Sequence, residues 1–139
     1  MRDWVKVVEV LVDKSVHVCI GSVDAKGVPE IKAMLAPRKR EGIGRFWFTT
    51  NTSSRRVAHY RKNPKACIYF FDSRFYKGAM LQGTMEVLED AESKAMIWRE
   101  GDTMYYPQGV TDSDYCVLRF TAKTGRYYGE FHSEDFTIQ

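Results

Sequence analysis

Hydrophobic and polar residues alternate in short runs along most of this chain, a pattern typical of β-strands. Seven such runs are predicted to be strands, at 16–23, 28–36, 45–50, 66–72, 79–88, 115–121 and 126–131. The first two flank a turn at 24–27 and the last two a turn at 123–125, so each pair is expected to form a hairpin. Seven short antiparallel strands with few helices between them favour a closed or nearly closed β-barrel, because closure removes exposed strand edges.

Three segments have helical spacing instead. Asp3 can cap a helix whose apolar residues recur on one face as far as Leu11. A second predicted helix follows the hydroxyl-rich run 52–54 and ends at Asn63–Pro64, because the residue before a proline is driven away from helical angles. A third begins after Asp90. Without repeats, linkers or low-complexity tracts, we expect one domain over residues 1–139, long enough to bury roughly two thirds of its unfolded surface.

Composition narrows the class of protein. Hydrophobic residues at 44% and charged residues at 28% are ordinary for a globular domain, and a net charge of +3 is too small for a nucleic-acid-binding stripe. No segment is apolar over the length of a bilayer, so we expect a cytoplasmic protein that does not contact membranes. Cys19, Cys67 and Cys116 are odd in number and far apart, so they are expected to be reduced core thiols, without a zinc site.

The start of the second helix has the chemistry of a phosphate site. A hydroxyl among residues 52–54 can cap this helix, and the first N–H groups of a helix have no partner inside it. The helix dipole, Arg55 and Arg56 add positive charge, and guanidinium groups match phosphate oxygens. The alternative is a capped surface helix with two solvated arginines.

Nearby positions can extend this anion site. Lys32 lies in the strand expected to neighbour the one that leads into the helix, and the strand-end hydroxyls of Thr49 and Thr50 can bind a phosphate or the edge of a ring. The basic run 38–40 is predicted to be a solvated turn instead.

No other group of residues indicates catalysis or metal binding. His17, His59 and His132 are scattered, without the nucleophile of a hydrolase triad. Asp112 and Asp114 lack the further oxygen ligands of a calcium site. The catalytic residues therefore stay unassigned, and no metal is expected.

The sequence resembles the pyridoxamine 5′-phosphate oxidase-like split-barrel flavoproteins, and within them the general stress protein 26 group. The resemblance covers nearly the whole chain and rests on the segments 28–35, 48–56 with 63–64, 82–87, and 105–107 with 114–118. It implies a mainly β fold, a split β-barrel of the FMN-binding type, and a homodimer with FMN at its interface. The cofactor-binding residues that it implies are Lys32, Ala33, Met34, Thr49, Thr50, Ser53, Ser54, Arg55 and Arg56.

The sequence also departs from the oxidases of that family. Pro37 stands where they have a second lysine, Lys77–Gly78 where they have a flavin-contacting glutamine, and the chain stops at Gln139 without their extended substrate-binding segment. The acidic tail 129–136 would repel a substrate phosphate if it lay near the flavin. We therefore expect an FMN-dependent oxidoreductase of unknown substrate that is not a true pyridoxamine-phosphate oxidase. The alternative is a non-catalytic flavin- or haem-binding stress-response protein.

Overall fold

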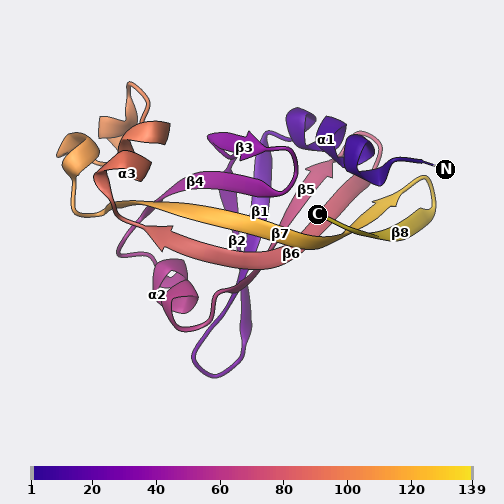
Figure 1. Ribbon diagram of the computed structural model, residues 1–139, viewed down its shortest axis with the longest axis horizontal. Helices are drawn as coiled ribbons and strands as arrows, with labels where there is room; N and C mark the ends of the chain where they lie inside the picture. The colour runs from indigo at the N-terminus through magenta and orange to yellow at the C-terminus, as the bar shows by residue number, and fades with distance from the viewer. Residues whose placement is uncertain (1, 139) are drawn as a thin grey trace.

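Eight antiparallel strands and three α-helices form the part of the chain that the structure, a computed structural model, describes, namely residues 2–138 (Figure 1). The strands are β1 (His17–Val23), β2 (Pro29–Leu35), β3 (Lys39–Glu41), β4 (Arg45–Asn51), β5 (Lys65–Asp72), β6 (Lys77–Leu88), β7 (Tyr115–Gly129) and β8 (His132–Thr137). The helices are α1 (Trp4–Lys14), α2 (Arg55–Lys62) and α3 (Ala91–Ile97), and the short 3₁₀ turns are η1 (Asp102–Met104) and η2 (Gly109–Thr111). The strand order is β2-β1-β5-β6-β7-β4-β3, with β8 paired to β7. The predicted mainly β fold is confirmed.

The hydrophobic core lies on one face of the sheet, because successive side chains of a strand point to opposite faces. Val18 and Ile20 of β1, and Ile68 and Phe70 of β5, are buried, whereas the residues between them are half-exposed. α1 packs against β5 and β6 and covers this face with its own apolar side.

Each helix begins at a side-chain cap that the sequence predicted. Asp3, Ser54 and Asp90 each accept a hydrogen bond from the backbone N–H three residues on, at 3.3, 3.4 and 2.9 Å. Among the candidates in the run 52–54, Ser54 is therefore the cap of α2.

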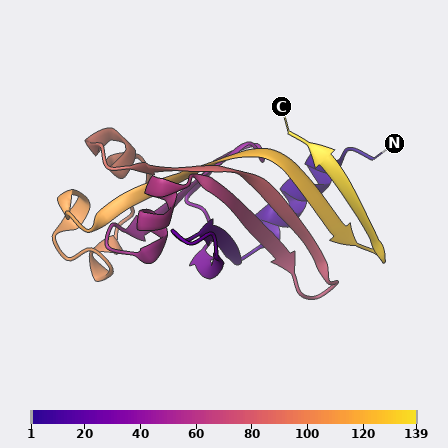
Figure 2. The same cartoon turned by 90° about the horizontal axis from the view of Figure 1, so that it is seen from below.

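The two longest strands, β6 and β7, bend where the register between them shifts (Figure 2). Gln82 pairs with Thr124 and Gly83 pairs with Ala122, so Lys123 has no partner on β6. Such a β-bulge increases the local twist of a sheet and bends its strands. The expectation that the strand of Lys32 neighbours the strand that leads into α2 is wrong, because β2 and β4 are far apart in the strand order and do not pair. The curvature nevertheless brings them to one shared cavity, which makes the barrel a split one.

The second predicted hairpin is wrong in its position. β7 runs unbroken through residues 123–125, and the chain reverses only between Gly129 and His132, where β8 begins. Gly125 is a packing glycine, since a Cβ there would overlap the ring of Phe136, and the turn itself uses left-handed backbone at Glu130.

The solvated turn predicted at 38–40 is also wrong. Lys39 and Arg40 belong to β3, which pairs with β4. The Lys39 ammonium lies 4.7 Å from the centre of the Trp47 ring, and Arg40 binds the carboxylate of Asp13 on α1 through hydrogen bonds of 2.9–3.1 Å. These partners are remote in sequence, so the composition of the run does not reveal them.

The prediction that all three cysteines are core thiols is wrong for two of them. Cys116 is buried, whereas Cys19 and Cys67 are half-buried on the outer face of the sheet. None of the helices within residues 2–138 is long and apolar enough to cross a membrane.

Replacement of Gly83 by alanine is expected to lower the free energy of unfolding by about 2–3 kcal/mol, because the new Cβ would overlap the carbonyl oxygen of Thr121 on β7. Urea unfolding measures this change. Gly44→Ala is the matched control, since its Cβ would meet its nearest neighbours at 3.7 and 4.0 Å, and its effect should stay within about 1 kcal/mol. Equal effects of the two substitutions would contradict the packing argument.

Candidate functional site

A cavity of about 280 Å³ opens in the split between β2 and β4. Its walls also include the start of α2 and the segment that follows η1. The lining residues are Lys32, Ala33, Met34, Leu35, Ala36, Thr49, Thr50, Asn51, Arg56, Tyr105 and Tyr106. Six of the nine residues predicted from the sequence therefore meet here, and Ser53, Ser54 and Arg55 do not line the cavity.

The turn between β4 and α2 is held by one aspartate. The Asp114 carboxylate accepts hydrogen bonds from the backbone N–H of Ser53 and the side-chain amide of Asn51, each at 2.8 Å, and its carbonyl accepts one from the N–H of Thr52. These hydrogen bonds keep the pKa of Asp114 below its usual range, with the Asn51 contact as the largest cause. The Ser53 N–H is thus committed to the fold and is not free to bind an anion.

Arg55 and Arg56 point in different directions. Arg55 forms an ion pair with Glu30 of β2 and is largely exposed. Arg56 lines the cavity, and its Nε is buried without a hydrogen-bond partner among the described residues. A buried guanidinium N–H without a partner is energetically costly, so it favours an anion or another acceptor at this place.

The cavity has a charged end and an aromatic end. The Arg55–Glu30 pair fixes the start of α2 beside the beginning of β2, close to Lys32. At the other end, the N–H of Arg38 donates to the carbonyl of Trp47 at 2.8 Å, which holds the continuation of β2 beside β4. Basic side chains therefore gather at the α2 end. The tyrosines are tied to the other end, because the N–H groups of Tyr105 and Tyr106 donate to the carbonyl of Asp102, whose carboxylate binds Arg38.

The aromatic end of the cavity is formed by the segment between β6 and β7, residues 89–114, which we call the excursion. Tyr106 is 3% exposed, and its ring centre lies 4.7 Å from that of Tyr115 and 6.1 Å from that of Trp98. Burial raises the pKa of Tyr106, and it raises that of Tyr115 to about 12. Both phenols are therefore neutral at physiological pH. Tyr105 is 48% exposed at the rim of the cavity.

A buried ion pair fastens this excursion to the sheet. Arg38 and Asp102 form two parallel hydrogen bonds of 2.8 Å, and their side chains are only 9% and 5% exposed. Arg38 also donates to the carbonyl of Ile97 at 3.1 Å. The hydrogen bond from Arg38 is the largest cause that keeps the pKa of Asp102 below its usual range. We define this pair as the Arg38–Asp102 clasp.

Sequence reasoning missed the clasp and the aromatic end. Arg38 and Asp102 are 64 positions apart, and no local pattern links them. Tyr105 and Tyr106 lie in one of the segments that carried the family resemblance, so a signal for them was present, but it did not indicate a role.

The histidines and aspartates considered as catalytic or metal-binding candidates lie outside the cavity, and several form hydrogen bonds within the protein. His59 shares a 2.8 Å hydrogen bond with Ser22, and His17 is exposed at the start of β1. Asp112 accepts hydrogen bonds from the N–H groups of Gln108 and Asp114 at 2.9 Å. Within residues 2–138, no group of three or more His, Cys, Asp or Glu side chains is placed to hold a metal ion.

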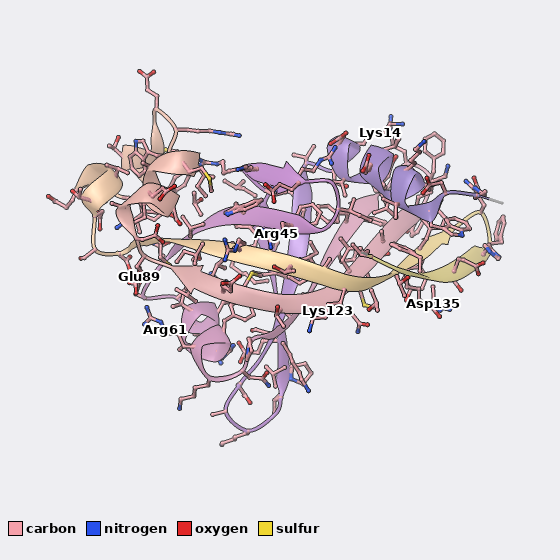
Figure 3. The ribbon with its side chains drawn as sticks, in the orientation of Figure 1. Lys14, Arg45, Arg61, Glu89, Lys123 and Asp135 are labelled. Carbon is pink, nitrogen blue, oxygen red and sulfur yellow. The ribbon has the colours of Figure 1, made fainter. Side chains whose placement is uncertain are left out.

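The acidic tail lies away from the cavity within one chain. β8 is at the opposite end of the sheet from α3, and Figure 3 shows Asp135 at the far end from Arg61 and Glu89. Asp135 is paired with Arg126 at 2.8 Å, and Glu130 with Arg2 at 2.9 Å. The expected repulsion of a substrate phosphate by this tail is therefore not met within a single protomer.

Known proteins are similar to this chain in sequence and in fold. The sequence matches a family model described as pyridoxamine 5′-phosphate oxidase over residues 5–129. A solved structure of a Clostridium acetobutylicum protein related to general stress protein 26 of Bacillus subtilis is 42% identical, with a TM-score of 0.88. That match covers 97% of this chain and 94% of the other. No curated protein is similar enough to match.

Two more distant structures share the fold. A pyridoxamine 5′-phosphate oxidase-related, FMN binding protein from Nostoc punctiforme is 12% identical with a TM-score of 0.75, and the match covers 100% of this chain and 98% of the other. A heme binding protein from Mycobacterium smegmatis is 14% identical with a TM-score of 0.78, and the match covers 99% of this chain and 59% of the other. At these identities the likeness concerns the fold alone.

Replacement of Asp102 by asparagine is expected to lower the free energy of unfolding by about 3 kcal/mol at pH 6, because it leaves the buried Arg38 charge without a counter-ion. A carboxyl whose folded pKa is lowered stabilises the fold above its unfolded pKa of about 3.9, and this stability is lost as pH falls through the folded value. The gap between wild type and variant in urea unfolding should therefore shrink below about pH 4.

Asp13→Asn is the control for this measurement. Its carboxylate also binds an arginine, Arg40, but its side chain is 61% exposed, so its loss should cost less than about 1 kcal/mol. A gap between wild type and Asp102→Asn that stays constant down to pH 3 would refute a stabilising charge at Asp102.

Proposed function

Because this chain belongs to the pyridoxamine 5′-phosphate oxidase family, as its sequence suggested, we propose that it binds flavin mononucleotide (FMN) in the cavity between β2 and β4. We further propose that it is a flavin-dependent oxidoreductase. The observation that carries the proposal is Arg56, which lines this cavity and whose Nε is buried without a hydrogen-bond partner among the described residues. A cofactor phosphate supplies the missing acceptor and the missing negative charge.

In the proposed complex, basic lining residues bind the phosphate, and hydroxyl and apolar lining residues contact the rest of the cofactor. Lys32 and Arg56 lie at the α2 end and bind the phosphate. Thr49 and Thr50 of β4 offer hydroxyls to the remainder of the cofactor, and Ala33 and Met34 of β2 offer backbone and apolar surface. FMN supplies the hydride or electron chemistry, and the protein supplies position and electrostatics.

The remaining predicted residues, Ser53, Ser54 and Arg55, contact other parts of the protein rather than the cofactor. Ser54 caps α2, Ser53 donates its N–H to Asp114, and Arg55 fixes Glu30 of β2. Together these contacts hold α2 and β2 in the relative position that places Lys32 and Arg56 at one end of the cavity. Their proposed role is to shape the site rather than to bind the phosphate.

The charge of the cavity argues against pyridoxamine-phosphate oxidase activity. Lys32 and Arg56 are the two cationic side chains among its lining residues, which suits one phosphate dianion. A phosphorylated substrate would need a further basic group beside the flavin ring. We therefore propose a substrate without a phosphate.

The alternative function is non-catalytic binding of a flavin or of haem. The lining residues of the cavity include methionine and tyrosine but no histidine, and they carry a cationic end that suits a phosphate. These features favour FMN over haem. Reduction of the bound flavin by NADH or NADPH distinguishes an oxidoreductase from a flavin carrier.

We also propose that the protein is a homodimer that uses the outer face of β1, β2 and β5. Pairing of β1 with β2 places Ile31, Ala33 and Leu35 on this face, and Ile31 and Leu35 are 74% and 54% exposed. A largely apolar hollow of about 470 Å³ lies beside them, lined in part by Cys67 and Gln82. A second copy of the same face covers this surface, and since β2 also borders the cavity, the cofactor would lie close to the interface.

FMN is expected to bind more tightly than riboflavin, and Arg56→Ala should weaken FMN binding by about 2 kcal/mol, or roughly 30-fold. The same substitution should leave riboflavin binding unchanged, because only FMN has the phosphate. Calorimetric titration of purified protein with both ligands measures these affinities. Arg55→Ala is the matched control, since Arg55 is bound to Glu30 outside the cavity, and it should change FMN affinity by less than about threefold.

Equal affinities for FMN and riboflavin would refute the phosphate site. Equal effects of the two arginine substitutions would instead show that both side chains bind the phosphate, contrary to their positions in the structure.

Sedimentation at micromolar protein concentration is expected to show a dimer. Ile31→Lys should convert it to a monomer, because it buries a charge without a partner in the proposed interface. Val10→Lys on α1 is the control, since Val10 is equally apolar and 55% exposed but lies on another face, so this variant should stay dimeric. A wild-type monomer in the presence of FMN would refute the homodimer.

A further inference from the structure

Tyr105 occupies an unusual place in the cavity. It lines the end opposite Lys32 and Arg56, and its side chain is 48% exposed, whereas the adjacent Tyr106 is 3% exposed. Tyr106 also lines the cavity, but it is held within the aromatic cluster of Trp98 and Tyr115, so little of its ring is accessible to a ligand. Tyr105 is left with an open ring at the rim, 6.3 Å from Tyr106 between ring centres.

The backbone at Tyr105 is rigidly attached to the sheet. The N–H groups of Tyr105 and Tyr106 both donate to the carbonyl of Asp102 at 2.9 Å. The Asp102 carboxylate is held by Arg38, whose own N–H donates to the carbonyl of Trp47 on β4. β4 also supplies Thr49 and Thr50, so the clasp fixes the rim tyrosine relative to the strand that forms the opposite wall.

Lys32 and Ala36 are four positions apart along this cavity, about 13 Å in an extended chain. A cofactor whose phosphate lies at Lys32 and Arg56 therefore extends its ring system toward Ala36 and the tyrosines. A half-exposed tyrosine ring at that end, with little freedom of its backbone, suits an offset stack on a planar heterocycle. Stacking of this kind needs no charge and no hydrogen bond from the ligand.

We propose that Tyr105 stacks on the isoalloxazine ring of bound FMN and that the Arg38–Asp102 clasp is the positioning element that holds it there. This inference rests on the proposed binding of FMN. It assigns recognition of the ring to Tyr105 and recognition of the phosphate to Arg56, so the two contributions are separable by experiment.

The test compares Tyr105→Ala with Met104→Ala in titrations with FMN and with riboflavin. Met104 precedes Tyr105 in the chain, is 75% exposed and does not line the cavity, so it is a matched control. Tyr105→Ala should weaken FMN and riboflavin by the same factor, about tenfold, because it removes a contact that both ligands make. Met104→Ala should change neither affinity.

Fluorescence of the bound flavin gives a second readout that does not depend on turnover. A phenol in contact with a flavin quenches its emission, so bound FMN should be several times brighter in Tyr105→Ala than in the wild type. Tyr105→Phe should keep the affinity of the wild type, since its ring can still stack.

The possible outcomes separate this inference from the proposed function. If the wild type binds no flavin, the proposed function fails and the stacking role fails with it. If the wild type binds FMN, but Tyr105→Ala leaves both the affinity and the emission unchanged, the stacking role alone is overturned. A loss confined to FMN, with riboflavin unaffected, would also overturn it, because it would place Tyr105 at the phosphate.

Discussion

Gly83 on β6 lies so close to the carbonyl oxygen of Thr121 on β7 that no side chain fits between them. This close approach belongs to the bulge that leaves Lys123 unpaired and bends the two longest strands of the sheet. Since β7 also pairs with β4, and β6 with β5, the bend is transmitted to both halves of the strand order. The cavity between β2 and β4 exists because the sheet curves this strongly but does not close.

Because β2 and β4 do not pair across the split, strand hydrogen bonds do not hold its two sides together. Two ion pairs join the segments at its ends instead. The Arg55–Glu30 pair joins α2 to β2 at one end of the split. The Arg38–Asp102 clasp joins the excursion between β6 and β7 to β4 at the other end. The first pair is largely exposed and contributes little energy, whereas the second is buried and costly to break. The aromatic end of the cavity is therefore the more firmly held of the two.

The two ends present different chemistry to a ligand. Arg56, whose buried Nε has no hydrogen-bond partner within residues 2–138, and nearby Lys32 favour a dianion at the α2 end. The half-exposed ring of Tyr105 favours a flat heterocycle at the other end. The phenols of Tyr106 and Tyr115 are neutral, so they add no charge at the aromatic end. A mononucleotide-like molecule with a phosphate and a planar ring matches this arrangement, which is the physical basis for the proposal of FMN.

Local chemistry was sufficient to predict much of this protein. The helix caps at Asp3 and Asp90 and the first hairpin follow from patterns within a few residues of one another. The same holds for four of the lining residues, Lys32, Thr49, Thr50 and Arg56, whereas Ala33 and Met34 were implied by the family resemblance. Such features depend on short-range hydrogen bonds and on side-chain alternation, which the order of residues largely determines.

Tertiary structure decided the rest, because it depends on contacts between remote segments. Arg55 and Arg56 are adjacent in sequence but about 100° apart around α2, so only the packing of this helix on the sheet decides which one faces the cavity. In the sequence Gly125 indicates a turn, whereas in the structure it makes room for the ring of Phe136. Arg38 resembles a solvated charge until Asp102, 64 positions away, is brought to it and buried, and no local pattern encodes that distance.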